Sequence, residues 1–176
     1  MLSSYFIFAC SEYIGKFIRF YGITNSARVG NISLGRIKQL CNHCRLLNIN
    51  VLVLTQTKLD QLIPNSLLMI PGYLEPIRHD RTNNGGGALV CVSENLVLSQ
   101  KTQLQSERFE HVWIDLKYQN KTICINAFER PPYQTAYDLD LFLNSVQDML
   151  EKMTNHENTS LKLVIGEMNL GNSYCS

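Results

Sequence analysis

The stretch that decides the fold is V-L-V-L-T-Q-T-K-L, which runs from Val51 to Leu59. Its first four residues are apolar, and the abrupt change to Thr-Gln-Thr is typical of a strand that is buried on both faces. A rigid strand holds the polar side chains at its carboxyl end in fixed positions. We therefore expect the polar side chains at this end of the strand, which include Gln56, to belong to a functional site.

The segments after this strand predict more strands. Four further apolar segments have the pattern of strands, and a turn joins two of them into a hairpin. The predicted strands are 88–92, 112–116, 122–128 and 161–165. In the hairpin, the alternation of side chains puts Trp113 on the face opposite Val112 and Ile114.

Two helices and a glycine-rich turn complete the predicted elements. Ser33 is a candidate N-cap for a helix that ends near Asn48, and the apolar spacing of Tyr137–Met153 indicates a helix that covers a sheet. The run Asn83–Gly87 precedes a strand. Because a phosphate cradle needs a helix behind it, we interpret this run as a hairpin turn. The pattern as a whole predicts α/β layers with a mixed sheet.

Composition narrows the classes of protein to which this chain can belong, but it does not identify a function. The 176 residues are 45% apolar, which suits one buried core. The net charge of +1 divides into +5 over residues 1–50 and −4 over 51–176, so it gives no support for a nucleic-acid binder. No apolar run is long enough to span a membrane. We expect an intracellular protein, with the nucleus as a candidate compartment, and no convincing signal peptide.

The six cysteines follow no disulfide spacing, and Cys91 and Cys124 lie in predicted strands, so we interpret them as reduced core residues. Cys41 and Cys44 would form half of a zinc site, but they continue the apolar face of the predicted helix and lack a second Cys/His pair. A secreted glycoprotein, with sugar on a sequon such as Asn120, is a distant alternative.

Several short motifs occur in an order that is specific when taken together. They are Thr55–Thr57 (T-Q-T), Gly72-Tyr73, Arg78–Arg81 (R-H-D-R), Gly85–Gly87, Glu129–Pro132 (E-R-P-P) and Gly166–Asn169 (G-E-M-N). This order resembles the endonuclease/exonuclease/phosphatase superfamily, and most closely the endonuclease domain of jockey-like non-LTR retrotransposons. The resemblance implies a four-layer α/β-sandwich, with two sheets face to face between helices.

The resemblance also implies a chemistry and a set of site residues. It implies Mg²⁺-dependent hydrolysis of DNA phosphodiesters, with no other small-molecule cofactor. The implied metal ligands are Gln56 and Glu167, and Arg130 and Asn169 would bind the phosphate of the substrate. Asn31 would be the early polar residue of the motif, with Asn25 as the rival; the implied catalytic set is Asn31, Glu129, Glu167 and Asn169.

Three of these residues depart from the family pattern. Gln56 replaces a glutamate that binds the metal, and an amide holds Mg²⁺ less well than a carboxylate. Glu129 replaces a tyrosine that contacts the phosphate, which puts an anion where the substrate needs none. Glu167 replaces an aspartate, and its extra methylene displaces the carboxylate. We therefore expect activity to be impaired.

The ends of the chain also bear on the expectation. The chain stops seven residues after Asn169, before any Ser-Asp-His, so the resemblance implies a C-terminally truncated domain over residues 25–176. Residues 1–24 are an aromatic-rich segment that we leave unassigned, although Phe17–Ile23 is a candidate first strand. We expect the sheet edge left by the truncation to be exposed or covered by this segment. His79, His111 and His156 are expected on the surface or in loops.

Two function classes remain in competition. One is a Mg²⁺-dependent DNA endonuclease with a weakened site, and the other is a non-catalytic remnant that at most binds nucleic acid or protein.

Overall fold

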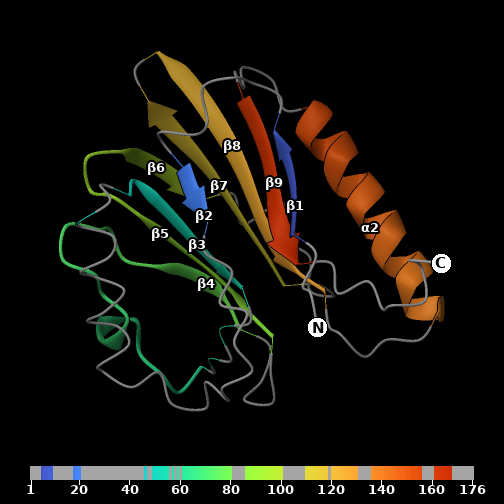
Figure 1. Ribbon diagram of the computed structural model, residues 1–176, viewed down its shortest axis with the longest axis horizontal. Helices are drawn as coiled ribbons and strands as arrows, with labels where there is room; N and C mark the ends of the chain where they lie inside the picture. The colour runs from blue at the N-terminus through green and yellow to red at the C-terminus, as the bar shows by residue number, and fades with distance from the viewer. Residues whose placement is uncertain are drawn as a thin grey trace.

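A computed structural model describes most of the chain (Figure 1). The described residues are 5–9, 18–20, 46, 49–55, 57, 59, 61–80, 86–100, 110–118, 120–130, 136–155 and 161–167. Within them lie two sheets and one long helix, and a short 3-10 turn, η2, at Asn65–Leu67. No helix among these residues combines the length and the apolar character needed to cross a membrane.

The larger sheet has five strands in the order β1-β9-β8-β7-β6. Its strands are β1 (Tyr5–Ala9), β6 (Val97–Gln100), β7 (Glu110–Tyr118), β8 (Lys121–Glu129) and β9 (Leu161–Glu167). β8 and β9 are parallel, and the other neighbours are antiparallel. The predicted hairpin at 112–128 is confirmed as β7 and β8, each longer than expected.

The smaller sheet has four strands in the order β2-β3-β5-β4. Its strands are β2 (Ile18–Phe20), β3 (Val51–Thr55), β4 (Ile77–His79) and β5 (Ala88–Val92). β2 runs parallel to β3, whereas β5 is antiparallel to both β3 and β4. The run Asn83–Gly87 therefore falls between two antiparallel strands, as its interpretation as a hairpin turn requires.

The two sheets pack face to face around the main core. Val53 and Val90 of the smaller sheet meet Ile114, Ile125 and other residues of the larger one, and all of these side chains are buried. A second cluster covers the outer face of the smaller sheet, where Leu52 and Leu89 pack with residues of the connecting segments. Every residue of β3 is buried, which confirms the prediction from its sequence.

Helix α2 (Ala136–Thr154) covers the outer face of the larger sheet. Phe142, Met149 and Met153 of the helix pack against Trp113 and Phe128 of the sheet. Trp113 thus lies on the face opposite Val112 and Ile114, as predicted. The order helix, sheet, sheet is that of an α/β sandwich. The helix predicted from Ser33 lies outside the described residues, apart from Leu46.

The aromatic-rich N-terminal segment contributes a strand to each sheet. β1 pairs antiparallel with β9 and so covers the outer edge of that strand, as we expected of this segment. β2 falls within the candidate strand Phe17–Ile23. Cys91 and Cys124 are buried free thiols, which agrees with their interpretation as reduced core residues. Cys41 and Cys44 lie outside the described residues.

Candidate functional site

Two rows of strand-terminal residues lie at one end of the sandwich. In the larger sheet, Glu129 is in register with Glu110 on β7 and with Glu167 on β9. In the smaller sheet, Ala88 is in register with His79 on β4 and with Thr55 on β3. In each row, the residues are the last of the strands that end there and the first of the antiparallel strand that begins there.

A contact between the sheets shows that these rows lie at the same end. The Nδ1 atom of His79 lies 3.2 Å from the backbone oxygen of His111, which is next to Glu110 on β7. The carboxyl end of β3, where Gln56 follows Thr55, is therefore at the same end of the molecule as the carboxyl ends of β8 and β9. The structure thus brings together the strand ends that the sequence motifs occupy.

Glu110 and Glu129 lie on the inner face of the larger sheet. They alternate in phase with Val112 and Ala127, which belong to the core between the sheets. Glu129 is only 1% exposed and Glu110 is 6% exposed. The carboxylates therefore stand at the end of the apolar core, where water screens charge poorly. Glu110 was not among the predicted site residues; in-phase alternation back from Val112 is the signal that could have identified it.

The segment after β3 packs closely against the start of β5, and we call the place where Thr57 meets Gly87 the β3–β5 corner. The backbone nitrogen of Thr57 donates a hydrogen bond of 3.3 Å to the oxygen of Gly87, at the start of β5. The side chain of Thr57 is buried, and its hydroxyl oxygen has no hydrogen-bond partner among the described residues. This hydroxyl packs against Gly87 at the start of β5.

Gly87→Ala should disturb this corner more than an equivalent change elsewhere. Gly87 has a φ of +93°, and an added Cβ would lie 2.5 Å from the Thr57 hydroxyl oxygen and 3.3 Å from the oxygen of His79. Gly72→Ala is the matched control, because Gly72 has a φ of +85° and open space around its Cβ position. We expect about 1–2 kcal/mol of lost stability for Gly72→Ala from the backbone alone. Urea unfolding should show a clearly larger loss for Gly87→Ala, and equal losses would contradict the close packing.

Several predicted site residues fall outside the described part of the chain. Gln56, Asn31, the rival Asn25 and Asn169 are among them. For Glu167 the structure gives the backbone, which ends β9 beside Glu129. In the described part, no group of three His, Cys, Asp or Glu side chains is arranged to hold a metal ion.

Arg130 follows β8 and lies on the helix side of the larger sheet. It is 5% exposed, and its guanidinium carbon lies 5.6 Å from the centre of the Phe142 ring of α2. This distance suits a cation–π contact. Glu129 and Arg130 are adjacent in sequence, but they occupy opposite faces of the sheet.

The prediction for His111 is wrong. It is not a surface or loop residue, because it lies within β7 and is 2% exposed. Its ring faces Phe128 with centroids 6.2 Å apart, and its Nδ1 lies 3.4 Å from the Oδ1 of Asn126. Burial lowers the pKa of His111 from 6.5 to about 4; the bond to Asn126 opposes this shift, and the charges of His79 and Lys152 add to it. His111 is two residues before Trp113 on the same strand, so the two side chains point to the same buried face. This alternation is the signal that the prediction missed. His79 lies on β4 and is half-buried, and His156 is outside the described residues.

Comparison with solved structures identifies the fold. The endonuclease domain of TRAS1, a telomere-specific non-LTR retrotransposon, superposes with a TM-score of 0.59 over 88% of this chain at 10% identity. D. rerio TDP2 complexed with a single-strand DNA product gives a TM-score of 0.57 over 84% of the chain at 11% identity. A mannosyl-6-phosphatase from Bacteroides thetaiotaomicron gives 0.58 over 88% at 13% identity.

These neighbours are all endonuclease/exonuclease/phosphatase-type folds, so the fold expected from the motifs is confirmed. The chain spans 59% of the TRAS1 domain, 60% of the TDP2 chain and 63% of the phosphatase. No protein-family model matches the sequence, and no curated protein gives a significant match.

Proposed function

We propose that this chain, which has the endonuclease/exonuclease/phosphatase fold, is an endonuclease-type domain of non-LTR retrotransposon kind whose Mg²⁺-dependent cleavage of DNA is impaired. The observation that carries the proposal is the register of β8 and β9, in which Glu129 and Glu167 are neighbours at the end of the sandwich. These are the strand ends at which the motifs E-R-P-P and G-E-M-N lie.

The neighbouring fold structures support a hydrolase and a nucleic-acid substrate. One of them is a retrotransposon endonuclease, and another is complexed with single-strand DNA. The order of motifs favours the first of these as the model for this chain. Within that model, Arg130 and Asn169 would bind phosphate, and Asn31 would assist at the site.

The electrostatics of the site argue for impairment. Adjacent parallel strands are about 5 Å apart, so Glu129 and Glu167 bring two acidic residues to neighbouring positions. Glu129 is nearly inaccessible to water, and in its charged form it would repel a phosphate more strongly than an exposed carboxylate would. A tyrosine at this position would place a neutral hydroxyl there instead. Glu129 therefore weakens the binding of the substrate that the fold suggests.

The residues present fit a magnesium ion only in part. Carboxylate oxygens are ligands that Mg²⁺ prefers, and Glu167 and Glu129 carry them. Gln56 contributes an amide oxygen without a charge. When bound, the ion would offset the negative charge that grows on the phosphate oxygens during hydrolysis. We expect the affinity for Mg²⁺ to be weak.

One observation favours the second candidate, a non-catalytic remnant that binds nucleic acid or protein. Arg130, the expected phosphate ligand, is buried over Phe142 beneath α2. An arginine held there is displaced from the inner face on which Glu129 lies. In this case restoring the acidic and tyrosine residues would restore no cleavage.

A plasmid-nicking assay with Mg²⁺ separates the two candidates. The native chain is compared with the triple variant Gln56→Glu, Glu129→Tyr and Glu167→Asp. We expect the triple variant to nick at least about a hundredfold faster, because a misplaced or missing catalytic group typically costs that factor. Gln61→Glu is the matched control for the Gln56→Glu change alone, because it adds the same charge at an exposed position.

Each outcome has a distinct meaning. Equal nicking by the native chain and the triple variant would contradict impairment. No nicking by either, together with a folded triple variant, would favour the remnant. Calorimetry with Mg²⁺ alone gives a readout that does not depend on activity: uptake should be weak for the native chain and at least about tenfold tighter for Gln56→Glu.

A further inference from the structure

A cavity of about 870 Å³ lies on the side of the sandwich where β4 and β6 form the edges of the two sheets. Ile77 of β4 and Leu98 of β6 line it, together with the segments before β4. We call it the β4–β6 pocket. Its apolar walls include Leu74, Ile77 and Leu98, which are partly buried at the border of the main core. The size suits several residues of a peptide or an organic ligand.

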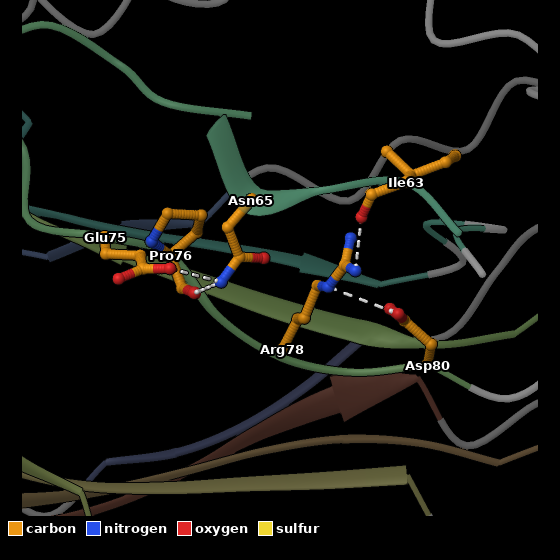
Figure 2. Close-up of polar contacts among 6 residues, drawn as sticks. All are labelled: Ile63, Asn65, Glu75, Pro76, Arg78 and Asp80. Atoms are coloured by element: carbon orange, nitrogen blue, oxygen red, sulfur yellow. Dashed lines mark hydrogen bonds and ion pairs between the residues drawn. The ribbon is translucent and has the colours of Figure 1, made fainter. Parts of the chain in front are cut away.

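The segment that precedes η2 closes one side of this pocket. Arg78 donates a hydrogen bond of 2.5 Å from Nη2 to the oxygen of Ile63, and Asn65 donates from Nδ2 to Glu75 Oε1 at 2.8 Å (Figure 2). Asn65 Nδ2 also approaches the oxygen of Pro76 at 3.4 Å. These bonds hold residues 63–65 along β4 and the chain before it. These hydrogen bonds therefore hold this wall of the pocket in place. The wall also covers the edge of β4 against the addition of another strand.

The carboxamide of Asn65 is part of the wall of this pocket. The two bonds from Nδ2 fix which end of the amide faces Glu75 and Pro76, so the oxygen points the other way, toward the side of Arg78 (Figure 2). This Oδ1 atom is buried and has no hydrogen-bond partner among the described residues. Because the oxygen is buried, it belongs to the packing of the wall and is not a contact for a ligand.

The charge of the lining favours a cation. Arg78 pairs with Asp80 at 3.2 Å, and both side chains are largely buried. Glu75 is the other charged residue of the lining; it is exposed, and it has no ion pair in the described part of the chain. A phosphate-bearing ligand would be repelled by this carboxylate. A basic group would be attracted to it.

The surface beside the pocket is apolar. Leu62 is 89% exposed and Val97 is 64% exposed, and each is adjacent in sequence to a residue that lines the pocket. Exposed apolar residues next to a concave site are typical of a surface that binds another polypeptide. A small soluble cation would leave them in water, whereas a peptide with apolar side chains would cover them.

We propose that the β4–β6 pocket binds a short peptide segment that carries an arginine between apolar residues. The guanidinium of the peptide pairs with the exposed Glu75, and its apolar side chains contact Leu74, Leu98 and the neighbouring surface. This pocket is separate from the strand ends at which cleavage is proposed, and it does not depend on that activity.

The test is a titration of the ¹⁵N-labelled full chain with two blocked tripeptides. One is leucine–arginine–leucine, and the matched control is leucine–citrulline–leucine, which keeps the shape of arginine but lacks its charge. The arginine peptide should shift the amide resonances of the non-proline residues in 63–65 and 74–78, with a Kd in the range of about 0.1–1 mM. The citrulline peptide should bind about tenfold more weakly.

Two variants assign the contacts. In Glu75→Gln, the two peptides should bind equally, because the charge that distinguishes them is gone. Asn65→Leu, checked for folding by circular dichroism, should weaken both peptides alike, because it removes the bonds that hold this wall of the pocket against Glu75 and Pro76. Equal binding of both peptides to the native chain, or shifts confined to other residues, would overturn the proposal. Shifts of the same resonances by a single-stranded oligonucleotide, with none from the peptides, would assign the pocket to nucleic acid instead and overturn it as well.

Discussion

Gly166→Ala is expected to cost about 4 kcal/mol of stability or more, which is beyond the usual cost of adding one methyl group to a core. Gly166 lies in β9 in register with Phe128 of β8. An added Cβ would overlap the backbone oxygen of Phe128 and lie 2.5 Å from its ring atom Cδ1. A ring can rotate, but a strand backbone that is hydrogen-bonded on both sides cannot move away. Urea unfolding measured by circular dichroism gives the free energy difference.

Two controls make this prediction specific. Gly72→Ala, at a position with no atom within 4 Å of the added Cβ, should cost far less. Combining Gly166→Ala with Phe128→Ala removes the ring but keeps the backbone oxygen, so stability should not be rescued. Recovery of stability in the double variant would show that the clash with the Phe128 ring, and not with the backbone oxygen, causes the loss. A loss below about 1 kcal/mol for Gly166→Ala would contradict the close approach of β9 to β8.

The second large effect is a loss of stability in acid caused by His111. Burial lowers the pKa of this side chain to about 4 from 6.5, its value in the unfolded chain. The unfolded state therefore binds the proton more readily than the folded state does. The stabilisation is complete above pH 6.5 and is lost as the pH falls from 6.5 to about 4. The total loss is about 3 kcal/mol, at 1.36 kcal/mol for each unit of pKa difference.

The measurement is chemical unfolding at a series of pH values between 4 and 7. Other acid-sensitive groups are shared by the native chain and its variants, so the difference between them isolates His111. His111→Gln keeps a polar group that can reach Asn126 but does not titrate, and its stability should fall less steeply across this range. His79→Gln is the control, and it should keep most of the steep fall, because burial and not the charge of His79 is the main cause of the lowered pKa of His111. Identical profiles for the native chain and His111→Gln would contradict the prediction.

The strands and the long helix were predictable because their signals are local. β3 and β5 are buried on both faces, and both appear in the sequence as continuous apolar runs. α2 extends from Ala136 to Thr154, close to the predicted 137–153, because its apolar spacing is regular. The predicted hairpin was right in position but short at both ends. Its outermost residues include Glu110 and Glu129, which are polar and so do not look like buried strand residues.

The functional site was predictable only in outline. The motifs identified Glu129 and Arg130, but their adjacency in sequence gave no indication that they face opposite sides of a sheet. His111 was misplaced because a histidine carries no sign of burial; its neighbours Phe128 and Asn126 come from another strand. The β4–β6 pocket was not anticipated, because its lining comes from three separate segments, each of which is unremarkable by itself.

The sequence by itself determined the elements and the order of the motifs, because strand burial, helix amphipathicity and turn chemistry depend on residues that are close along the chain. Only the tertiary structure decided which ends of those elements meet. The parallel pairing of β8 with β9 sets Glu129 beside Glu167, and the contact between His79 and His111 brings the two sheets together at that end. Such pairings depend on contacts between residues far apart in the chain, and these contacts fix both the burial of each charge and the space around it.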